Sequence, residues 1–221
     1  MRRYSRAFVL FAIAVIVLGV TSPAAVVAQG TGGNDEPSVS MQAADLSEGL
    51  PKPTCPILAL DLDTSYDNEA LDILGIAYTL VTPSAFSTIN LDNFHVLYVG
   101  WEYSGGDDPA AFTALNARKS DIANWVQKGN SIVVLGEDPD WGYAWIPLAV
   151  TQTEEDANTV TITAPSHAIM TGLTDGLLSG WGNSYHEYFN TWDPAFTVLA
   201  ENAAHDPITL VATHGAGYII I

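Results

Sequence analysis

The chain is poor in positive charge. It contains 7 Lys and Arg against 25 Asp and Glu in 221 residues, so its formal net charge at pH 7 is −18. Nucleic acids and anionic lipid headgroups are bound by clustered Lys and Arg side chains, and a polyanion repels both. We therefore expect no nucleic-acid partner. The acidity itself is equally compatible with a saline habitat and with simple solubility, so charge alone does not select a ligand.

Cysteine is nearly absent. Cys55 is the single cysteine, so an internal disulfide is excluded. It lies 35 residues beyond Val20, the end of the first apolar run, whereas a lipid-anchored cysteine should follow such a run directly. The prolines at positions 53 and 56 predict entry into a strand, not the helix N-terminus that activates thiols. We expect a packed structural thiol.

Neither disorder nor a fibrous architecture fits the composition. Apolar residues make up 48% of the chain and charged residues only 14%, which excludes disorder of the whole chain. The 18 Gly and 12 Pro follow no fixed period, which excludes collagen and coiled coil. A chain of this length buries enough surface to form a core without a disulfide or a metal.

The N-terminus has the pattern of a secretory signal peptide. Arginines at positions 2, 3 and 6 precede a 14-residue apolar run, residues 7–20, and small residues lead to Ala28. We predict a signal peptide over residues 1–28 and a secreted or cell-envelope location, with no stable membrane insertion after cleavage. An uncleaved anchor is the alternative, but the run is shorter than the ~20 residues of a spanning helix. Residues 29–56 are rich in Gly, Ser, Pro and acidic residues and predict a flexible linker.

From residue 57 onward, short apolar runs alternate with helical patterns. This alternation predicts an α/β domain with a parallel sheet and right-handed connections. Trp125 falls at a core position of the longer helical pattern. The expected strands are residues 57–62, 76–81, 94–100 and 131–135, and the expected helices are residues 67–74, capped by Asp67, and 109–129.

The second half of the chain is less regular. Residues 159–164 alternate like an edge strand. Residues 172–192, rich in Gly, Ser, Asn and aromatics, predict a long structured loop. Three further strands are expected at residues 196–200, 208–212 and 218–221. Because the chain ends inside the last of these, we expect the domain, residues 57–221, to be truncated at its C-terminus.

Short motifs along this domain occur in an order that resembles the class I glutamine-amidotransferase-like superfamily, and within it the secreted trehalose-utilisation-like branch. The resemblance implies a flavodoxin-like three-layer sandwich with a mostly parallel sheet. Each motif is short, and their shared order is what carries the resemblance. The motifs are Ile57–Asp63, Asn93–Gly100, Trp125–Gly129, Pro165–Leu173, Tyr185–Phe189 and Gly215–Ile219.

The chain departs from that family at the nucleophile. True amidotransferases place a cysteine on the sharp turn after a central strand. The matching turn, residues 135–139, contains neither Cys nor Ser, and no Gly-x-Ser-x-Gly motif occurs. Thiolate-dependent glutamine hydrolysis is therefore excluded at this turn, and no catalytic residue is assigned. We predict that Glu137 takes the nucleophile's place as a hydrogen-bond acceptor for a ligand; equally, it could only cap the following turn.

Candidate ligand-binding residues follow the ends of the predicted strands. Ligands of parallel sheets bind beyond the carboxyl ends of the strands, so side chains there should converge. Aromatic faces with nearby carboxylates suit a carbohydrate or another polar small molecule. The alternative is that the aromatic residues only close the rim of the domain. The candidates are Asp63, Trp101, Glu102 and Glu137, together with His186 and Glu187 in the aromatic-acidic segment.

Three functions remain open. The first is an exported, non-catalytic ligand-binding or scaffold module of a larger envelope or secreted protein. The second is a carbohydrate-modifying enzyme that uses Glu137, His186 and Glu187 for acid–base chemistry. The third is a Mg²⁺-dependent phosphatase-like domain, suggested by Asp61 and Asp63 but lacking the Ser or Thr expected after the third strand.

Neither a cofactor nor a metal is expected. The five histidines include no pair at i,i+4 spacing, so the pattern of a helical zinc site is missing. The acidic turn that begins at Asp138 starts like a calcium loop, but Gly142 stands where a further oxygen ligand is needed.

Overall fold

The computed structural model describes residues 56–62, 68–100, 109–135, 142–180 and 185–221, without the side chains of residues 69 and 186. The predicted signal peptide, the linker up to residue 55 and Cys55 lie outside the described residues. Within the described ranges, no helix has both the length and the apolar character needed to cross a membrane.

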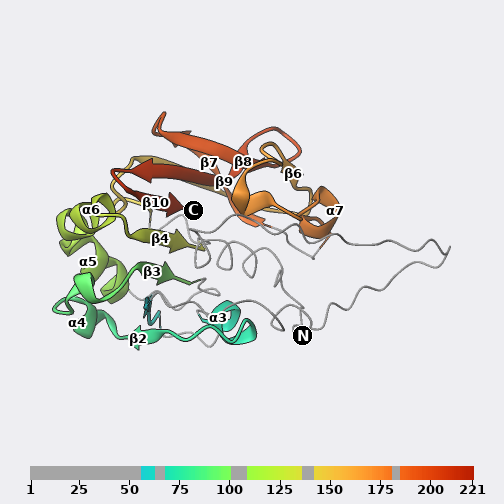
Figure 1. The fold of residues 1–221 in the computed structure, drawn as a ribbon. Coiled ribbons are helices and arrows are strands. Elements are labelled where there is room, and N and C mark those ends of the chain that lie inside the picture. Colours follow the sequence, from blue (N-terminus) through green and yellow to red (C-terminus); the bar gives the residue numbers. More distant parts are fainter. Residues whose placement is uncertain (1–55, 63–67, 101–108, 136–141, 181–184) are drawn as a thin grey trace.

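The domain is built on an eight-stranded central sheet (Figure 1). Its first five strands in spatial order are joined by parallel pairing, and the remaining pairings are antiparallel. The fold is therefore α/β with a mostly parallel sheet, as the sequence predicts. The strand order is β2 (Thr79–Val81), β1 (Ile57–Leu60), β3 (Val96–Val99), β4 (Ser131–Val134), β10 (Gly217–Ile220), β9 (Pro207–His214), β8 (Phe196–Glu201) and β6 (Thr161–Ile162).

Both faces of the central sheet are covered, which gives three layers. Successive residues of β1 enter different clusters: Leu58 and Leu60 belong to the largest core, whereas Ile57 and Ala59 belong to a second core on the opposite face. The largest core includes residues of α4 (Pro83–Phe86), α5 (Pro109–Ala117) and α6 (Lys119–Gln127), and of a second sheet formed by β5 (Val150–Ala157) and β7 (Tyr185–Trp192).

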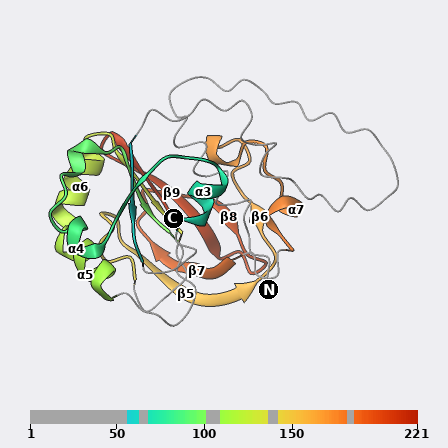
Figure 2. The same ribbon diagram turned by 90° about the horizontal axis from the view of Figure 1, so that it is seen from below.

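The opposite face is covered by shorter elements. α3 (Glu69–Ile73) packs against β1 and β3, and η2 (Ala168–Met170) with α7 (Asp175–Leu178) packs against β8, β9 and β10. Figure 2 shows α4, α5 and α6 grouped on one side of the sheet and α7 on the other. The single turn η1 (Leu91–Asn93) leads into β3.

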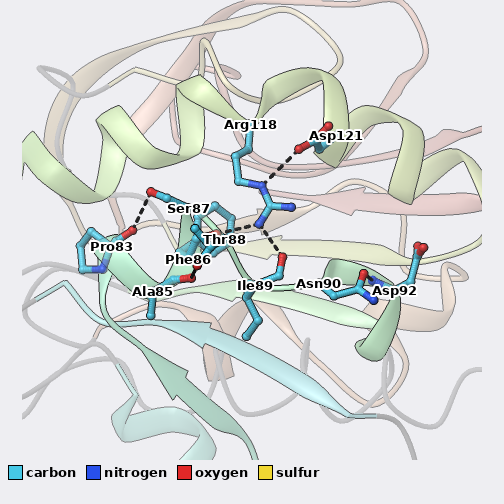
Figure 3. Close-up of polar contacts among 10 residues, drawn as sticks. All are labelled: Pro83, Ala85, Phe86, Ser87, Thr88, Ile89, Asn90, Asp92, Arg118 and Asp121. Carbon is cyan, nitrogen blue, oxygen red and sulfur yellow. Dashed lines mark hydrogen bonds and ion pairs between the residues drawn. The ribbon is translucent and has the colours of Figure 1, made fainter.

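The predicted helix 109–129 is divided into α5 and α6 at Arg118. The Arg118 guanidinium donates to the carbonyls of Phe86, at 2.6 Å, and Ile89, at 2.9 Å. It also pairs with Asp121 at 3.3 Å and lies over the Phe86 ring, 5.3 Å from its centroid (Figure 3). The helical pattern is continuous in sequence, but this arginine stands at the N-cap of α6 and ties the helix junction to the end of α4.

The prediction of a long loop over residues 172–192 is wrong. This segment contains α7 and the eight-residue strand β7. Its partner β5 is absent from the predicted elements, because residues 150–157 read Val-Thr-Gln-Thr-Glu-Glu-Asp-Ala and have no apolar alternation. Register shifts near Thr151 and Glu154 disturb the pairing of these two strands, and such bulges also break a period of two in the sequence.

Most other predicted elements are confirmed. The strands predicted at residues 57–62, 76–81, 94–100 and 131–135 correspond to β1 to β4, and the three C-terminal strands to β8, β9 and β10. The prediction of an edge strand at residues 159–164 is confirmed by β6. Trp125 is 2% exposed, and its indole N–H donates to the Leu91 carbonyl at 2.8 Å. The predicted cap of α3, Asp67, lies outside the described residues, and the N-cap is Asn68.

Candidate functional site

The carboxyl ends of β1, β3 and β4 lie side by side. Leu60 is in register with Val99, and Val99 with Val134. Hydrogen bonding continues one residue beyond two of these strands, because the Leu135 amide donates to the Val99 carbonyl at 3.0 Å and the Asp61 amide donates to the Val81 carbonyl at 2.9 Å. The three chain segments that leave this edge therefore start next to one another.

Four of the predicted ligand-binding residues belong to these segments. Asp63 directly follows the described residue Leu62, Trp101 and Glu102 follow Gly100, and Glu137 is the second residue after Leu135. All four lie outside the described residues. The structure shows that the segments that carry them start at adjacent strand ends.

A polar cluster lies at the same edge of the sheet, after β8. β8 runs in the direction of β10 and β4, so Asn202, which follows β8, is at the carboxyl edge. Its side-chain amide donates to Glu155 Oε2 at 2.7 Å, and the Tyr185 hydroxyl donates to the same oxygen at 3.3 Å. Burial, followed by the Glu155 charge, raises the pKa of Tyr185 to about 12, so Tyr185 is a neutral donor at physiological pH.

Glu187 is the one predicted site residue whose side chain is described. It lies in β7, is only 7% exposed, and accepts a hydrogen bond from the Tyr143 hydroxyl. Tyr143 is 6% exposed, and its ring lies 5.6 Å from the ring of Phe189. Burial, together with the Glu187 charge, raises the pKa of Tyr143 well above its usual value, which keeps this hydroxyl protonated as a donor.

This burial changes the role expected of Glu187. Glu187 is expected to bind a ligand, but in the structure its carboxylate accepts a hydrogen bond from within the protein. This bond joins β7 to the segment that follows residues 136–141. His186 precedes it in β7, and the side chain of His186 lies outside the described residues. The structure therefore brings Glu187 together with Tyr143 and Phe189, two aromatic residues that were not among the predicted site residues.

Two of the motifs that carried the family resemblance have structural roles. The His167 side chain caps η2, because its Nδ1 accepts from the Ile169 amide at 3.3 Å. Partial burial lowers the pKa of His167, which favours the neutral ring that this cap needs. Gly217 lies so close to α6 that a Cβ atom there would be 2.2 Å from the Val126 carbonyl oxygen, and it would be 2.0 Å from that of Asn130, just after the helix.

Asn68, the N-cap of α3, is a buried polar residue that the sequence analysis does not single out. Its side chain is buried, with the residue only 6% exposed, and its Oδ1 has no hydrogen-bond partner among the described residues. An Asn before a helix is an ordinary N-cap residue, so the sequence does not indicate that the side-chain oxygen of Asn68 lacks a partner among the described residues. Within the described ranges, no group of three or more His, Cys, Asp and Glu side chains is placed to hold a metal ion.

Comparison with solved structures finds chains with a similar fold. A protein from Thermoplasma acidophilum assigned as a component of a GMP synthase matches with 16% identity over 75% of this chain and 81% of that chain, at a TM-score of 0.46. A glutamine amidotransferase from Thermotoga maritima matches with 9% identity over 75% and 74% of the two chains, at 0.47.

A larger enzyme shows a similar arrangement over part of its length. An exo-β-1,4-mannosidase from Opitutaceae bacterium strain TAV5 matches with 12% identity over 74% of this chain and 30% of that chain, at a TM-score of 0.40. In sequence, no protein-family model and no curated protein matches this chain.

Proposed function

We propose that this chain is an exported, non-catalytic amidotransferase-like domain that binds a carbohydrate or another polar small molecule at the carboxyl edge of its sheet. It would serve as a ligand-binding or scaffold module of a larger envelope or secreted protein. The proposal includes membership of the secreted trehalose-utilisation-like branch and cleavage of the signal peptide after Ala28.

The observation that carries this proposal is the alignment of three strand ends. Because β1, β3 and β4 are in register, the segments bearing Asp63, Trp101, Glu102 and Glu137 leave the sheet at adjacent points. The crevice beyond the carboxyl ends of parallel strands is the usual ligand site of such sheets. Tryptophan faces cover the C–H surfaces of sugars while carboxylates accept hydrogen bonds from hydroxyl groups.

The absence of catalysis is supported by the sequence that follows β4. Residues 135–139 read Leu-Gly-Glu-Asp-Pro, so a carboxylate stands where amidotransferases have a thiolate. A carboxylate is a much weaker nucleophile than a thiolate toward a carboxamide, and glutamine is therefore not expected to be hydrolysed.

One observation favours a second candidate, a carbohydrate-modifying enzyme. Glu187 is buried beside Tyr143, and acid–base residues of enzymes are often carboxyl groups held in such surroundings. In this candidate Glu137, His186 and Glu187 exchange protons with sugar hydroxyl groups.

Saccharide binding with product detection tests both candidates. The purified chain is incubated with glucose, galactose, mannose, N-acetylglucosamine, trehalose, maltose and cellobiose, and binding is measured by ligand-observed NMR. Binding without a new product supports the module, whereas a product that disappears in Glu187→Gln supports the enzyme. Release of ammonia from glutamine by the wild type would contradict the loss of amidotransferase chemistry.

A matched pair of variants locates the site. Glu137→Gln should weaken saccharide binding, because a neutral amide is a poorer acceptor for hydroxyl groups than a carboxylate. Asp92→Asn is the control. Asp92 belongs to η1, which precedes β3 at the amino edge of the sheet, and its exposed side chain pairs with Lys128. Equal affinity in the two variants, or no saccharide bound by the wild type, would refute the proposed site.

A further inference from the structure

The central sheet ends at β2 on one side. β2 is the first strand in the spatial order, it pairs with β1, and no described strand lies beyond it (Figure 1). The Asp61 amide donates to the Val81 carbonyl at 2.9 Å, so the backbone groups of Val81 face β1. Because these directions alternate along a strand, the amide and carbonyl of Leu80 face away from the sheet. Such an edge is a template for pairing with another strand.

The other end of the same sheet is closed by side chains. β6 is the last strand there, and its Ile162 amide donates to the Asp175 carboxylate at 2.8 Å. Just before β6, the Ser179 hydroxyl accepts from the Val160 amide at 2.9 Å and donates to the Val160 carbonyl at 3.2 Å. These side chains occupy backbone groups that an incoming strand would need. At β2 the corresponding side chain, Leu80, is apolar and 47% exposed.

The chain around β2 carries no charge. Residues 73–91 contain no Asp, Glu, Lys, Arg or His, although the formal net charge of the whole chain is −18. Natural sheets protect an open edge by placing charged side chains on it, and this edge has none. β2 is only three residues long and Pro83 follows soon after it, so pairing here is short. The exposed residues around the edge include Ala77, Thr79, Leu80, Thr82, Ser84 and Ala85.

The charge distribution selects the kind of partner that fits this edge. Two copies of a polyanion repel each other, so they approach most closely where neither presents a charge. The charged residues that flank the uncharged stretch are Asp72, which accepts from the Tyr78 hydroxyl at 2.9 Å, and Asp92, which pairs with Lys128. A cationic partner would be attracted to the acidic parts of the chain instead. The uncharged edge therefore fits a second copy of this chain.

We infer that β2 is a self-association site through which two copies of this chain pair. Two identical edges related by a two-fold axis pair antiparallel, and each contributes the same residues. The Leu80 amide of each copy donates to the Leu80 carbonyl of the other, and the two exposed leucine side chains meet across the axis. The two central sheets then form one continuous sheet. The inference does not depend on the proposed ligand or on the proposed function.

This dimer should be weak, and salt should strengthen it. The contact is short, so we expect a dissociation constant of about 1–100 μM, in the range of transient complexes. Salt screens the repulsion between the two polyanions, and the contact itself contains no ion pair to be weakened. Raising NaCl from about 0.05 to 0.5 M should therefore lower the dissociation constant about threefold or more. Sedimentation velocity of the purified chain at several concentrations measures it.

A matched pair of exposed leucines locates the contact. Leu80→Lys places like charges opposite each other at the axis and should weaken the dimer about tenfold or more. Leu177→Lys is the control, because Leu177 in α7 is 36% exposed and the substitution changes the net charge equally. Circular dichroism melting of the dilute chain verifies folding. Leu80→Lys should melt there at the wild-type temperature, because its side chain is exposed.

Cross-linking tests the antiparallel geometry. The single cysteine, Cys55, is first replaced by serine, and Leu80→Cys or Leu177→Cys is then added. Residue 80 lies opposite itself across the proposed axis, at the ~5.5 Å Cα separation of a hydrogen-bonded antiparallel pair. A short bismaleimide should therefore join two copies of the Leu80→Cys chain, and it should leave the Leu177→Cys chain monomeric.

Four results would overturn the inference. The first is a wild type that stays monomeric up to about 200 μM, above the expected dissociation constant. The second is a dimer that Leu80→Lys and Leu177→Lys weaken equally. The third is a dimer that salt weakens, because this would indicate an interface held by ion pairs, which the uncharged edge does not provide. The fourth is a wild-type dimer whose Leu80→Cys variant is cross-linked no better than the Leu177→Cys variant.

Discussion

Tyr143 and Glu187, which are 44 residues apart in the chain, are joined by a hydrogen bond inside the protein. Tyr143 belongs to the segment between β4 and β5, and Glu187 belongs to β7. The same segment is held a second time, because the Lys119 side chain donates to the Ala144 carbonyl at 2.6 Å. The chain that follows residues 136–141 is thus held both by the small sheet and by α6.

Removing the Tyr143 hydroxyl should destabilise the fold. Tyr143→Phe leaves the buried Glu187 carboxylate without this donor, and we expect a loss of about 1.5–3 kcal/mol in the free energy of unfolding. Urea unfolding measures it. Tyr218→Phe is the control, since Tyr218 is 50% exposed, and its change should stay within about 0.5 kcal/mol. Equal stability of the two variants would show that the buried hydrogen bond contributes nothing.

Arg118 should not be replaceable by lysine. Its planar guanidinium bonds the carbonyls of Phe86 and Ile89 from one nitrogen while another nitrogen faces Asp121. Lysine keeps the charge but not this geometry, and we expect Arg118→Lys to lose about 1–3 kcal/mol in urea unfolding.

Lys128→Met is the comparison for Arg118. Lys128 pairs with Asp92 at 2.9 Å, but both side chains are about 60% exposed, so this ion pair should contribute less than about 1 kcal/mol. An Arg118→Lys variant as stable as Lys128→Met would contradict a structural role of the guanidinium.

His167 should make stability depend on pH on the acid side. Partial burial lowers its pKa from 6.5, so the folded chain favours the neutral ring. Between the lowered pKa and 6.5 the unfolded chain binds more protons, and the stability contributed by this residue is present above pH 6.5 and lost as the pH falls below it.

His167→Asn separates the titration from the cap. Asparagine is a good N-cap residue and does not titrate, so the variant should keep η2 but show a weaker loss of stability as the pH falls below 6.5. The free energy of unfolding of both chains is measured across this range. Identical pH profiles would exclude His167 as the source.

The regular half of the fold was predictable because its signals are local. β1, β3 and β4 are short and fully buried, and all their residues but Ser131 are apolar, so they can be recognised as strands in the sequence. β5 was not predictable, because its residues are mostly polar and its strand conformation depends on pairing with β7, which lies far along the chain. The break at Arg118 also depends on distant atoms, the carbonyls at the end of α4.

The candidate site was predictable only in part. The rule that parallel strands end at one edge agrees with the register of β1, β3 and β4, whereas the convergence of the side chains beyond these strands stays a prediction. The sequence did not indicate that Glu187 is buried against Tyr143, since the two lie in segments that β5 and α7 separate. Nor did it distinguish Asn68, which has an orphaned acceptor, from Asn90, which caps η1.

Gly217 should tolerate no side chain. It begins β10 where the hairpin from β9 crosses the end of α6, and a Cβ atom there would lie 2.0 Å from the Asn130 carbonyl oxygen and 2.2 Å from that of Val126. Both neighbours are backbone atoms, so relief requires that α6 or the central strand β10 move. We expect Gly217→Ala to lower the free energy of unfolding by about 3 kcal/mol, the upper end of overpacking in a core.

Gly176→Ala is the control, since a Cβ atom in α7 would meet nothing within 4 Å, and it should be neutral or slightly stabilising. Chemical unfolding of the two variants provides the comparison. A Gly217→Ala chain as stable as Gly176→Ala would mean that α6 and β10 do not approach each other this closely.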